Sequence, residues 1–461
     1  MYSWLVPRVM LPLYDRLSGR RLWAEVVRLR ALQWRSPAEL EHRALARLRP
    51  LLEHAAAHVP YYRALFAQAG VQPAEVGAVS DLAGLPVTTK ATLRAAFPHE
   101  AVADNLPRGR RLRMTTGGSS GVPLEFFADR AGIDRWLGSY FFFLEWAGTG
   151  IWDTTVLVDS PAQVPTNVPP PPRYLRALRR LLLGERTIYL SAIELSAAEL
   201  RARTAHLAGG RRYFIRTLPS YAARLAAQVV ADGQELPAYP KALISHGETL
   251  SAANVEVIGQ AFQCPIVNQY SSWDIPQMAQ TCPDNPPLFH VNSERVILRV
   301  VRDDGSDASP GEVGRILVTD LANWVMPFIN YEIGDRAVAG AACPCGRGLP
   351  TLGGLDGRIV ETIQTPDGRV LSPGILSHLL VSGSEAIPYI WEYQAVQTAP
   401  GEVVLRVVPT ERFEAGFADR LRRDLEGYLG PSVCVQVEAV ANIPAEPSGK
   451  RPIIKSSIPP N

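Results

Sequence analysis

The sequence contains one stretch, residues 115–123, whose side chains suit the binding of phosphate. It combines three glycines with four Ser/Thr hydroxyls. Glycines let backbone N–H groups approach a polyanion, and hydroxyls donate hydrogen bonds to phosphate oxygens. The stretch has neither the Gly-Lys-Ser/Thr ending of a P-loop nor the spacing of a dinucleotide-binding motif. Alone, it fits either an exposed flexible turn or a phosphate-binding loop made of Thr115, Thr116, Gly117, Gly118, Ser119, Ser120 and Gly121.

Four other residues have the chemistry of zinc ligands, namely Cys282, His290, Cys343 and Cys345. Three thiolates and one imidazole form a closed tetrahedral set of the kind that binds structural zinc. Their spacing matches none of the common zinc-finger patterns, and the alternative is four unrelated residues with the cysteines acting as small buried apolar groups. Both pairs lie in segments rich in Pro and Gly, where a metal cross-link would stabilise the chain most. We therefore predict a structural zinc site.

Composition limits the class of protein. The chain has 461 residues, of which 47% are hydrophobic and 20% charged, which suits one large and one small globular domain. A net charge of +2 gives no electrostatic argument for nucleic acid or a membrane surface as a partner. No apolar run reaches the roughly 18 residues of a membrane span, and residues 1–17 are expected to form a packed helix rather than a signal peptide. Five cysteines are too few and too unevenly placed for a disulfide framework, so a cytoplasmic setting is expected.

The elements that must position these residues follow from periodicity. Residues 1–100 are predicted to be mostly helical, and a helix rich in aromatic residues is predicted at 129–146. Strands and helices then alternate, which predicts parallel βαβ units; the strands lie near residues 154–158, 187–190, 212–215, 242–245 and 265–268. Beyond residue 290 the pattern becomes β-rich, with strands at 295–302, 312–319 and 336–339 and a hairpin turn at Asp303-Asp304-Gly305.

The last hundred or so residues form a different unit. A hairpin around Pro366-Asp367-Gly368 is followed by a short helix, by strands at 389–397, 403–408 and 433–440, and by a helix at 411–429. Such a compact α+β unit is large enough to fold alone. We therefore predict a large domain over residues 1–357 and a small one over residues 358–461.

Five segments stand in an order that resembles the adenylate-forming superfamily, and the phenylacetate–CoA ligase-like group with its capsule-biosynthesis members most closely. They are the stretch 116–123, Ser245-His246-Gly247-Glu248, Tyr270-Ser271-Ser272-Trp273-Asp274, Tyr331-Glu332-Ile333-Gly334-Asp335, and Gly357-Arg358 followed by Pro447-Ser448-Gly449-Lys450. Similar cysteine pairs recur in that group. The resemblance covers nearly the whole chain. It implies an α/β fold in which helices surround βαβ sheets with a β-rich subdomain, and a small, mobile α+β C-terminal domain that carries Lys450.

The resemblance implies that a carboxylic acid is joined to ATP, giving an acyl-adenylate and pyrophosphate. Two anions must approach each other, so phosphate charge must be neutralised and the carboxylate oriented. The loop with Thr116 would hold the β- and γ-phosphates. Asp274 lies where the family usually has a glutamate that binds Mg²⁺, a role that a shorter carboxylate can also fill. Lys450 would reach the carboxylate and the α-phosphate, which suits a mobile point charge on a long stem.

The remaining predicted contacts divide between nucleotide and acid. Tyr270, Ser271 and the Gly247-Glu248 turn would lie near the adenine, and Asp335 with Arg358 would bind the ribose. The acyl pocket is predicted to include Tyr140, Ser245, His246, Ser272 and Trp273. Structural alternatives stay open: Asp335 could cap a turn, Lys450 could lie in an exposed turn, Tyr270 and Trp273 could be core, and His246 could be an ordinary buried histidine.

Several positions depart from the family pattern. Ser271 replaces the usual glycine after the tyrosine, and Trp273 is bulkier than the common residue before the acid, so the acyl site should be narrowed or reshaped. Asn330 stands where relatives often carry arginine. Val360 stands where an aspartate is often found at the hinge, so rotation of the small domain should differ. None of these changes removes a group that the first half-reaction requires.

Three functions remain after this argument. The leading one is an acid–CoA ligase that uses ATP, Mg²⁺, CoA and an aromatic acid. In the second, the acyl-adenylate passes to an amine, a carrier-protein thiol or another nucleophile, because no residue pattern identifies a CoA pocket. The third is a degenerate scaffold that binds nucleotide, against which the presence of Lys450, Asp335 and Asp274 argues. Neither the acid nor the assembly of a homodimer follows from the sequence.

Overall fold

The protein is described by a computed structural model that covers residues 5–107, 109, 111–115, 124–159, 173–174, 177, 187–191, 196–208, 212–248, 250–358, 363–366, 370–371, 389–444 and 452–458. Residues 116–121 of the predicted phosphate loop and Lys450 lie outside these ranges. The same holds for most of residues 160–186, between the first two strands of the predicted βαβ region, and for the short helix expected after the Pro366-Asp367-Gly368 hairpin. Every structural statement below refers to the described residues.

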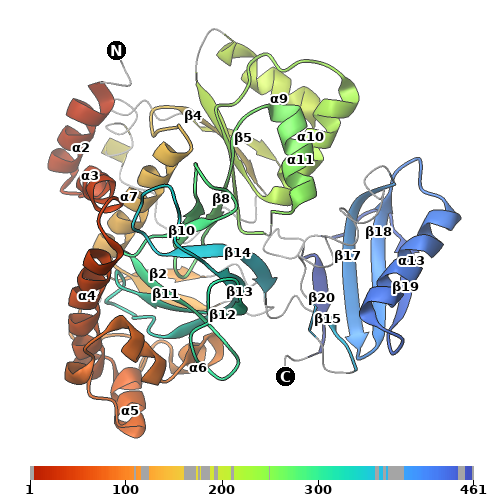
Figure 1. The fold of residues 1–461 in the computed structure, drawn as a ribbon. Helices are drawn as coiled ribbons and strands as arrows, with labels where there is room; N and C mark the ends of the chain where they lie inside the picture. The colour runs from red at the N-terminus through yellow and green to blue at the C-terminus, as the bar shows by residue number, and fades with distance from the viewer. Residues whose placement is uncertain are drawn as a thin grey trace.

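The chain begins with helices along one side of the molecule, drawn in red and orange in Figure 1. Ser36 starts the longest of them by accepting a hydrogen bond from the Glu39 amide at 3.3 Å, and Pro37 follows at the first helical position. Gly70, with φ at +67°, ends the helix that begins at Pro60 and has the left-handed conformation common at such ends. The elements are η1 (Val6–Met10), α2 (Leu11–Ser18), α3 (Leu22–Leu32), α4 (Pro37–His58), α5 (Pro60–Ala69), η2 (Pro73–Glu75) and η3 (Val79–Gly84), so the predicted helical start is confirmed.

Two further helices are placed by capping side chains. Thr89 accepts from the Thr92 amide at the start of α6 (Lys90–Ala96), directly after the short strand β1 (Thr88–Thr89). Asp129 accepts from the Gly132 amide at 2.7 Å and starts α7 (Arg130–Trp146), the predicted aromatic helix. Between them, β2 (Leu112–Thr115) and β3 (Glu125–Ala128) form an antiparallel hairpin in which Thr115 pairs with Glu125. The predicted phosphate loop therefore connects two paired strands.

The predicted βαβ region is confirmed as a parallel sheet. Its strands are β4 (Thr154–Asp159), β5 (Thr187–Ser191), β6 (Tyr213–Thr217), β7 (Leu243–His246) and β8 (Ile266–Tyr270), in the spatial order β5-β4-β6-β7-β8. The connecting elements are α9 (Ala197–Thr204), η6 (Ala205–Leu207), α10 (Pro219–Asp232) and α11 (Ala252–Phe262). Apolar side chains of strands and helices, such as Val156, Ile215, Leu225 and Phe262, pack into one core. The carboxyl ends of these strands share one edge.

The β-rich region continues the same sheet. Beyond β8 the strands run antiparallel, and they are β9 (Ala279–Thr281), β10 (Phe289–Val291), β11 (Val296–Val301), β12 (Val313–Asp320), β13 (Tyr331–Ala339) and β14 (Thr351–Arg358). The result in the described ranges is a single 12-stranded sheet, with β1 paired to β13. The sequence pattern did not show β9, β10 and β14, the strands that join the two regions.

The C-terminal residues form a separate α+β unit, drawn in blue in Figure 1. Its core is its own and includes Ile363, Leu405, Phe417, Leu425 and Ile454. The elements are β15 (Ile363–Gln364), β16 (Val370–Leu371), β17 (Ile390–Ala399), β18 (Glu402–Pro409), α13 (Ala415–Leu429), β19 (Cys434–Ala439) and β20 (Ile454–Ser456). Four of the strands form one sheet in the order β19-β18-β17-β20, and β15 pairs with β16. The domain boundary predicted at residue 358 stays a prediction, because residues 359–362 are not described.

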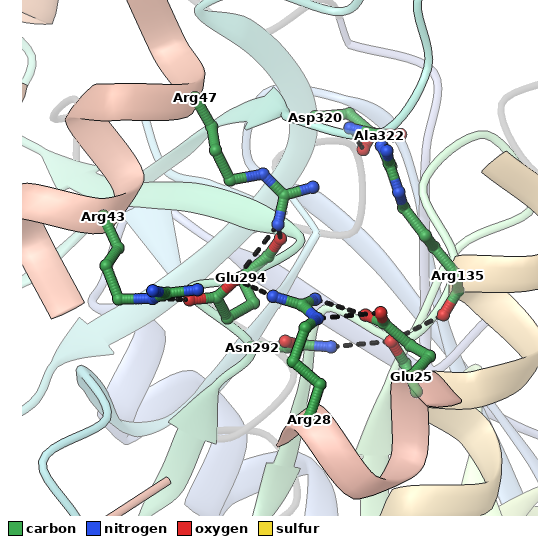
Figure 2. A network of polar contacts seen from close by, with 10 residues as sticks. Glu25, Arg28, Arg43, Arg47, Arg135, Asn292, Glu294, Asp320 and Ala322 are labelled. Atoms are coloured by element: carbon green, nitrogen blue, oxygen red, sulfur yellow. Dashed lines mark hydrogen bonds and ion pairs between the residues drawn. The ribbon is translucent and has the colours of Figure 1, made fainter. Parts of the chain in front are cut away.

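An ion-pair network fixes the N-terminal helices to the sheet. Figure 2 shows that Arg28 of α3 and Arg43 and Arg47 of α4 all point to Glu294, which lies between β10 and β11. Burial acts to raise the pKa of the Glu294 carboxyl, but Arg43 and Arg28 outweigh it and hold that pKa below its usual value. Glu294 therefore stays ionised as the common partner of two helices. None of the helices in the described ranges has the length and apolarity needed to cross a bilayer.

Candidate functional site

The two segments that carry the predicted aspartates are joined by reciprocal hydrogen bonds. Tyr270, at the end of β8, donates from its hydroxyl to Asp335 Oδ2 at 2.8 Å. Tyr331, at the start of β13, donates to Asp274 Oδ2 at 3.0 Å. All four side chains are buried. Each Tyr-x-x-x-Asp segment thus supplies the tyrosine that holds the aspartate of the other, and the predicted metal-binding and ribose-binding carboxylates are brought together.

A bulge in β13 determines where Asp335 lies. Arg336 pairs with Arg315 of β12 and Glu332 pairs with Leu317, so residues 333–335 face the single residue between them. Gly334, inside the bulge, has φ at +87°, a conformation that side chains with a Cβ rarely adopt. Bulges of this kind re-aim side chains next to functional sites. The glycine of the Ile-Gly-Asp motif is therefore required by the backbone that presents Asp335.

The loop that carries Asp274 is held by its own serines. Ser271 Oγ accepts a hydrogen bond from the Gln277 amide at 3.1 Å, and Ser272 Oγ accepts from the Ile275 amide at 3.1 Å. Trp273, between Ser272 and Asp274, is half-buried. The hydroxyls of Ser271 and Ser272 thus shape the loop itself, and their predicted contacts with nucleotide and acid stay predictions.

Strand register brings further predicted nucleotide residues to the same place. Asp335 and Arg358 are directly opposite each other across β13 and β14, as expected of two residues that bind one ribose. Gly247 follows β7 with φ at +78° and turns the chain at the carboxyl end of that strand. Glu248 comes next and is half-buried. Since β7 and β8 are paired neighbours, this turn lies beside the end of the strand that carries Tyr270.

Tyr331 is suited to its role as a donor. Burial first, and the neighbouring Asp274 carboxylate second, raise the pKa of the Tyr331 phenol far above its usual value. The phenol therefore keeps its proton at neutral pH. It stays a donor to Asp274 Oδ2, while the described residues show no hydrogen bond to Asp274 Oδ1.

The residues predicted for the acyl pocket lie on α7 (Tyr140), at the carboxyl end of β7 (Ser245 and His246) and in the loop after β8 (Ser272 and Trp273). Tyr140 and His246 are half-buried. Ser245 is fully buried, and its Oγ lies 3.3 Å from the Val267 carbonyl and 3.2 Å from Asn268 Oδ1, both on β8. The structure adds a residue that sequence reasoning missed, Arg216 of β6, whose guanidinium lies over the Tyr140 ring at 5.2 Å from its centre. An arginine inside a strand of an arginine-rich chain gave no signal.

The four predicted zinc ligands form a cluster. One ligand atom from each of Cys282, His290, Cys343 and Cys345 lies within 4.8 Å of all the others. The Cys282 and Cys343 sulfurs are 3.8 Å apart, and Cys345 Sγ is 3.2 Å from His290 Nε2. Tetrahedral sulfur ligands about 2.3 Å from zinc lie about 3.8 Å from each other. Two of the four residues come from the β9–β10 hairpin and two from the β13–β14 connection. The distances between their ligand atoms match the size of a closed zinc site.

The groups around this cluster set its protonation. His290 Nδ1 lies 3.4 Å from the Leu349 carbonyl, which leaves Nε2 facing the thiols, and burial lowers the pKa of the imidazole, which favours the neutral form that binds metal. Burial raises the pKa of the Cys282 thiol to about 11. Burial acts the same way on Cys345, but Arg347 outweighs it through its backbone N–H and side chain and lowers that pKa. The donor set fits zinc, which itself deprotonates coordinating thiols.

Arg347 also fastens the cysteine segment to the N-terminal helices. Its guanidinium lies over the rings of Trp34 and Trp146, at 4.8 and 4.7 Å from their centres. It donates to Asp284 Oδ2 at 2.6 Å and to Gln33 Oε1 at 3.0 Å. The cluster thus sits where the β9–β10 hairpin, the β13–β14 connection and the helices meet.

Comparison with known proteins bears on the fold of the chain. Residues 363–457 match the family model of the CapK C-terminal domain. Over 80% of its length the chain is 24% identical to the phenylacetate-coenzyme A ligase of Thermus thermophilus, covering 81% of that protein, and over 75% it is 23% identical to protein CapK of Staphylococcus aureus, covering 74%. A crystal structure of 2-hydroxyisobutyryl-CoA ligase in the postadenylation state superposes with a TM-score of 0.73 at 21% identity, over 92% of this chain and 91% of the other. The predicted adenylate-forming fold is therefore confirmed.

Proposed function

We propose that this chain, a member of the adenylate-forming superfamily in the branch of phenylacetate–CoA ligases and CapK proteins, activates a carboxylic acid with ATP and transfers the acyl group to CoA. The observation that carries the proposal is the reciprocal pairing of Tyr270 with Asp335 and of Tyr331 with Asp274. This pairing places the carboxylate proposed to bind the ribose and the carboxylate proposed to bind Mg²⁺ in one buried region. The region lies at the edge of the sheet where α/β proteins bind ligands.

The residues then divide the first half-reaction among themselves. Asp335 accepts hydrogen bonds from the ribose hydroxyls, and Arg358, its register partner, acts at the same sugar. Asp274, whose Oδ2 accepts from Tyr331, would hold Mg²⁺, and the charge of that ion would offset the charge of the phosphates. Residues 116–121 hold the β- and γ-phosphates. Lys450 stabilises the charge that builds between the carboxylate and the α-phosphate as the acid oxygen attacks phosphorus and pyrophosphate leaves.

We also propose that Cys282, His290, Cys343 and Cys345 hold a structural zinc ion. The size of the cluster, the neutral imidazole and the proximity of Arg347 to Cys345 support this. Four protein ligands leave no open coordination position, so the ion takes no part in catalysis. None of the five cysteines, all of which lie in the described residues, is in a disulfide, as a reducing compartment such as the cytoplasm would keep them.

The experiment that tests the function is a pyrophosphate-release screen over many carboxylic acids, with and without CoA. We expect acid-dependent release with an absolute need for Mg²⁺, and multiple turnovers with CoA. Turnover that requires an added amine or carrier protein instead of CoA would show that the acyl acceptor is not CoA. No acid-dependent release under any condition would contradict the proposal.

A further inference from the structure

The charged side chain of Arg216 lies beside an apolar cluster between α7 and the parallel sheet. Arg216, Ile244 and Val267 are register partners on β6, β7 and β8, so their side chains lie in one row on one face. Ile244 and Val267 belong to an apolar cluster with Phe214 and Leu144, against which Tyr140 packs. Arg216, next to the last residue of β6, is thus a cation in the same row as the apolar side chains of Ile244 and Val267.

Among the described residues, Arg216 has a cation–ring contact but no anionic partner. The described residues offer it no ion pair and no hydrogen bond, and its Nε is buried without a partner. Arg212, at the other end of the same β-strand region, differs because it lies 3.7 Å from Asp153, which Lys241 also binds at 3.2 Å. A cation taken partly out of water without a counter-charge is costly, and the guanidinium fork matches carboxylate and phosphate oxygens.

The surroundings of Arg216 are those of the proposed acyl pocket. Tyr140, whose ring Arg216 covers, and His246, two residues beyond Ile244 on β7, are both predicted pocket residues, and both are half-buried. Gln269 pairs with His246 on β8, and its Oε1 is also buried without a partner in the described residues. An apolar wall with a few convergent polar atoms is typical of a site that binds a small molecule.

We propose that the acid activated by this protein carries a second anionic group, remote from the reacting carboxylate, and that Arg216 binds this group. The inference rests on the proposed ligase function, because it takes this pocket to be the acyl site. Arg216 is a specificity residue in this scheme, and it contacts neither ATP nor the reacting atoms. A site built for an ionic hydrogen bond discriminates strongly against an analogue that lacks the group, since its own buried polar atoms are then left unpaired.

The test compares acids that differ mainly in the second charge. Pentanoate with glutarate, and 4-methylphenylacetate with 4-carboxyphenylacetate, are used in ATP–pyrophosphate exchange without CoA. We expect the wild-type kcat/KM to favour the dianionic member of at least one pair by on the order of 100-fold, mainly through KM. Arg216→Gln should remove that preference by lowering the kcat/KM of the dianionic member far more than that of the monoanionic member, and Arg216→Lys should keep part of it. Arg212→Gln, an arginine that already has an acidic partner, is the matched control and should behave like the wild type.

A binding measurement keeps the two proposals apart. Calorimetry without ATP gives the Kd of each acid, and we expect the dianion that is preferred in exchange to bind the wild type but not Arg216→Gln. Such binding without any exchange would contradict the ligase activity and support the anion site. Exchange that favours the monoanions, or that Arg216→Gln lowers equally for both members of each pair, would overturn the role of Arg216 and leave the ligase intact.

Discussion

The Tyr331 hydroxyl donates a hydrogen bond of 3.0 Å to Asp274 Oδ2, although 57 positions separate the two residues in the chain. The contact crosses from the start of β13 to the loop after β8, and the tyrosine lies beside Phe328 in the main core. The position of the carboxylate proposed for Mg²⁺ is therefore determined by the packing of β13 and not by its own loop alone.

Replacing Tyr331 with Phe should weaken the use of Mg²⁺. The ring and its packing remain, while the hydrogen bond to Asp274 is lost, at a cost of about 1 kcal/mol in the free energy of unfolding. We expect the Mg²⁺ concentration for half-maximal pyrophosphate exchange to rise several-fold, and Asp274→Asn to raise it further. Tyr270→Phe is the matched control, since it should raise the KM for ATP through Asp335 instead. An unchanged Mg²⁺ requirement in both Tyr331→Phe and Asp274→Asn would assign the metal to other residues.

Replacing Lys450 with Ala should stop adenylation without unfolding the protein. A charge that acts mainly in the transition state is removed, so pyrophosphate exchange should fall on the order of 100- to 1,000-fold. ATP binding and thermal stability should stay near wild type. Lys455→Ala, in the exposed part of β20, is the control that removes a nearby lysine and should retain activity. Wild-type exchange in Lys450→Ala would refute the assignment.

Replacing Gly334 with Ala should disturb the bulge that presents Asp335. No atom crowds a Cβ there, so the cost comes from φ at +87° and should be about 1–2 kcal/mol in the free energy of unfolding. The KM for ATP should rise at the same time, which urea denaturation and exchange kinetics would measure. Gly416→Ala, near the start of α13 and with equal space, should be neutral or slightly stabilising. Equal stability of the two variants would show that the bulge tolerates a side chain.

Removing zinc should lower stability before it lowers turnover. We expect elemental analysis of protein purified without added metal to give about one zinc per chain. The double substitution Cys343→Ser and Cys345→Ser should lose the ion, and a strong chelator should lower the melting temperature while Mg²⁺-dependent exchange of the still-folded protein continues. Cys434→Ser changes an exposed cysteine outside the cluster and should keep the zinc. Metal-free wild-type protein of full stability would exclude the site.

Sequence patterns predicted the parts of the fold that have long or repeated signals. The aromatic helix α7 and the alternation of β4 to β8 with helices were placed within a few residues, because apolar periodicity is a local signal. Strands β9, β10 and β20 were missed, since three residues are too few to show alternation. Helix α13 starts at Ala415 instead of residue 411, because the Thr410 hydroxyl and carbonyl hold a turn there first.

The site was predicted as a set of residues and not as a geometry. The motifs identified Asp274 and Asp335, but nothing in either segment indicates that its tyrosine serves the other segment. Such pairing depends on the join of β8 to β13 through β9, β10 and β14, which is a property of the sheet. The cysteine cluster was predicted because its residue types are rare enough to be noticed, whereas Arg216 is one of many arginines.

The short strand β20 has a consequence for how the proposed catalytic lysine can be delivered. Gln394 donates to the Pro452 carbonyl at 3.0 Å, and the Ala395 amide donates to the Ile453 carbonyl at 2.8 Å, so the chain is attached to β17 from Pro452 onward. Lys450 is two residues upstream, a tether of about 7 Å at most between Cα atoms. Any movement of the C-terminal unit would therefore carry Lys450 with it. Replacing the C-terminal unit with that of a relative would therefore replace both the lysine and the strands that position it. The tyrosine–aspartate pairs of the large domain would stay unchanged.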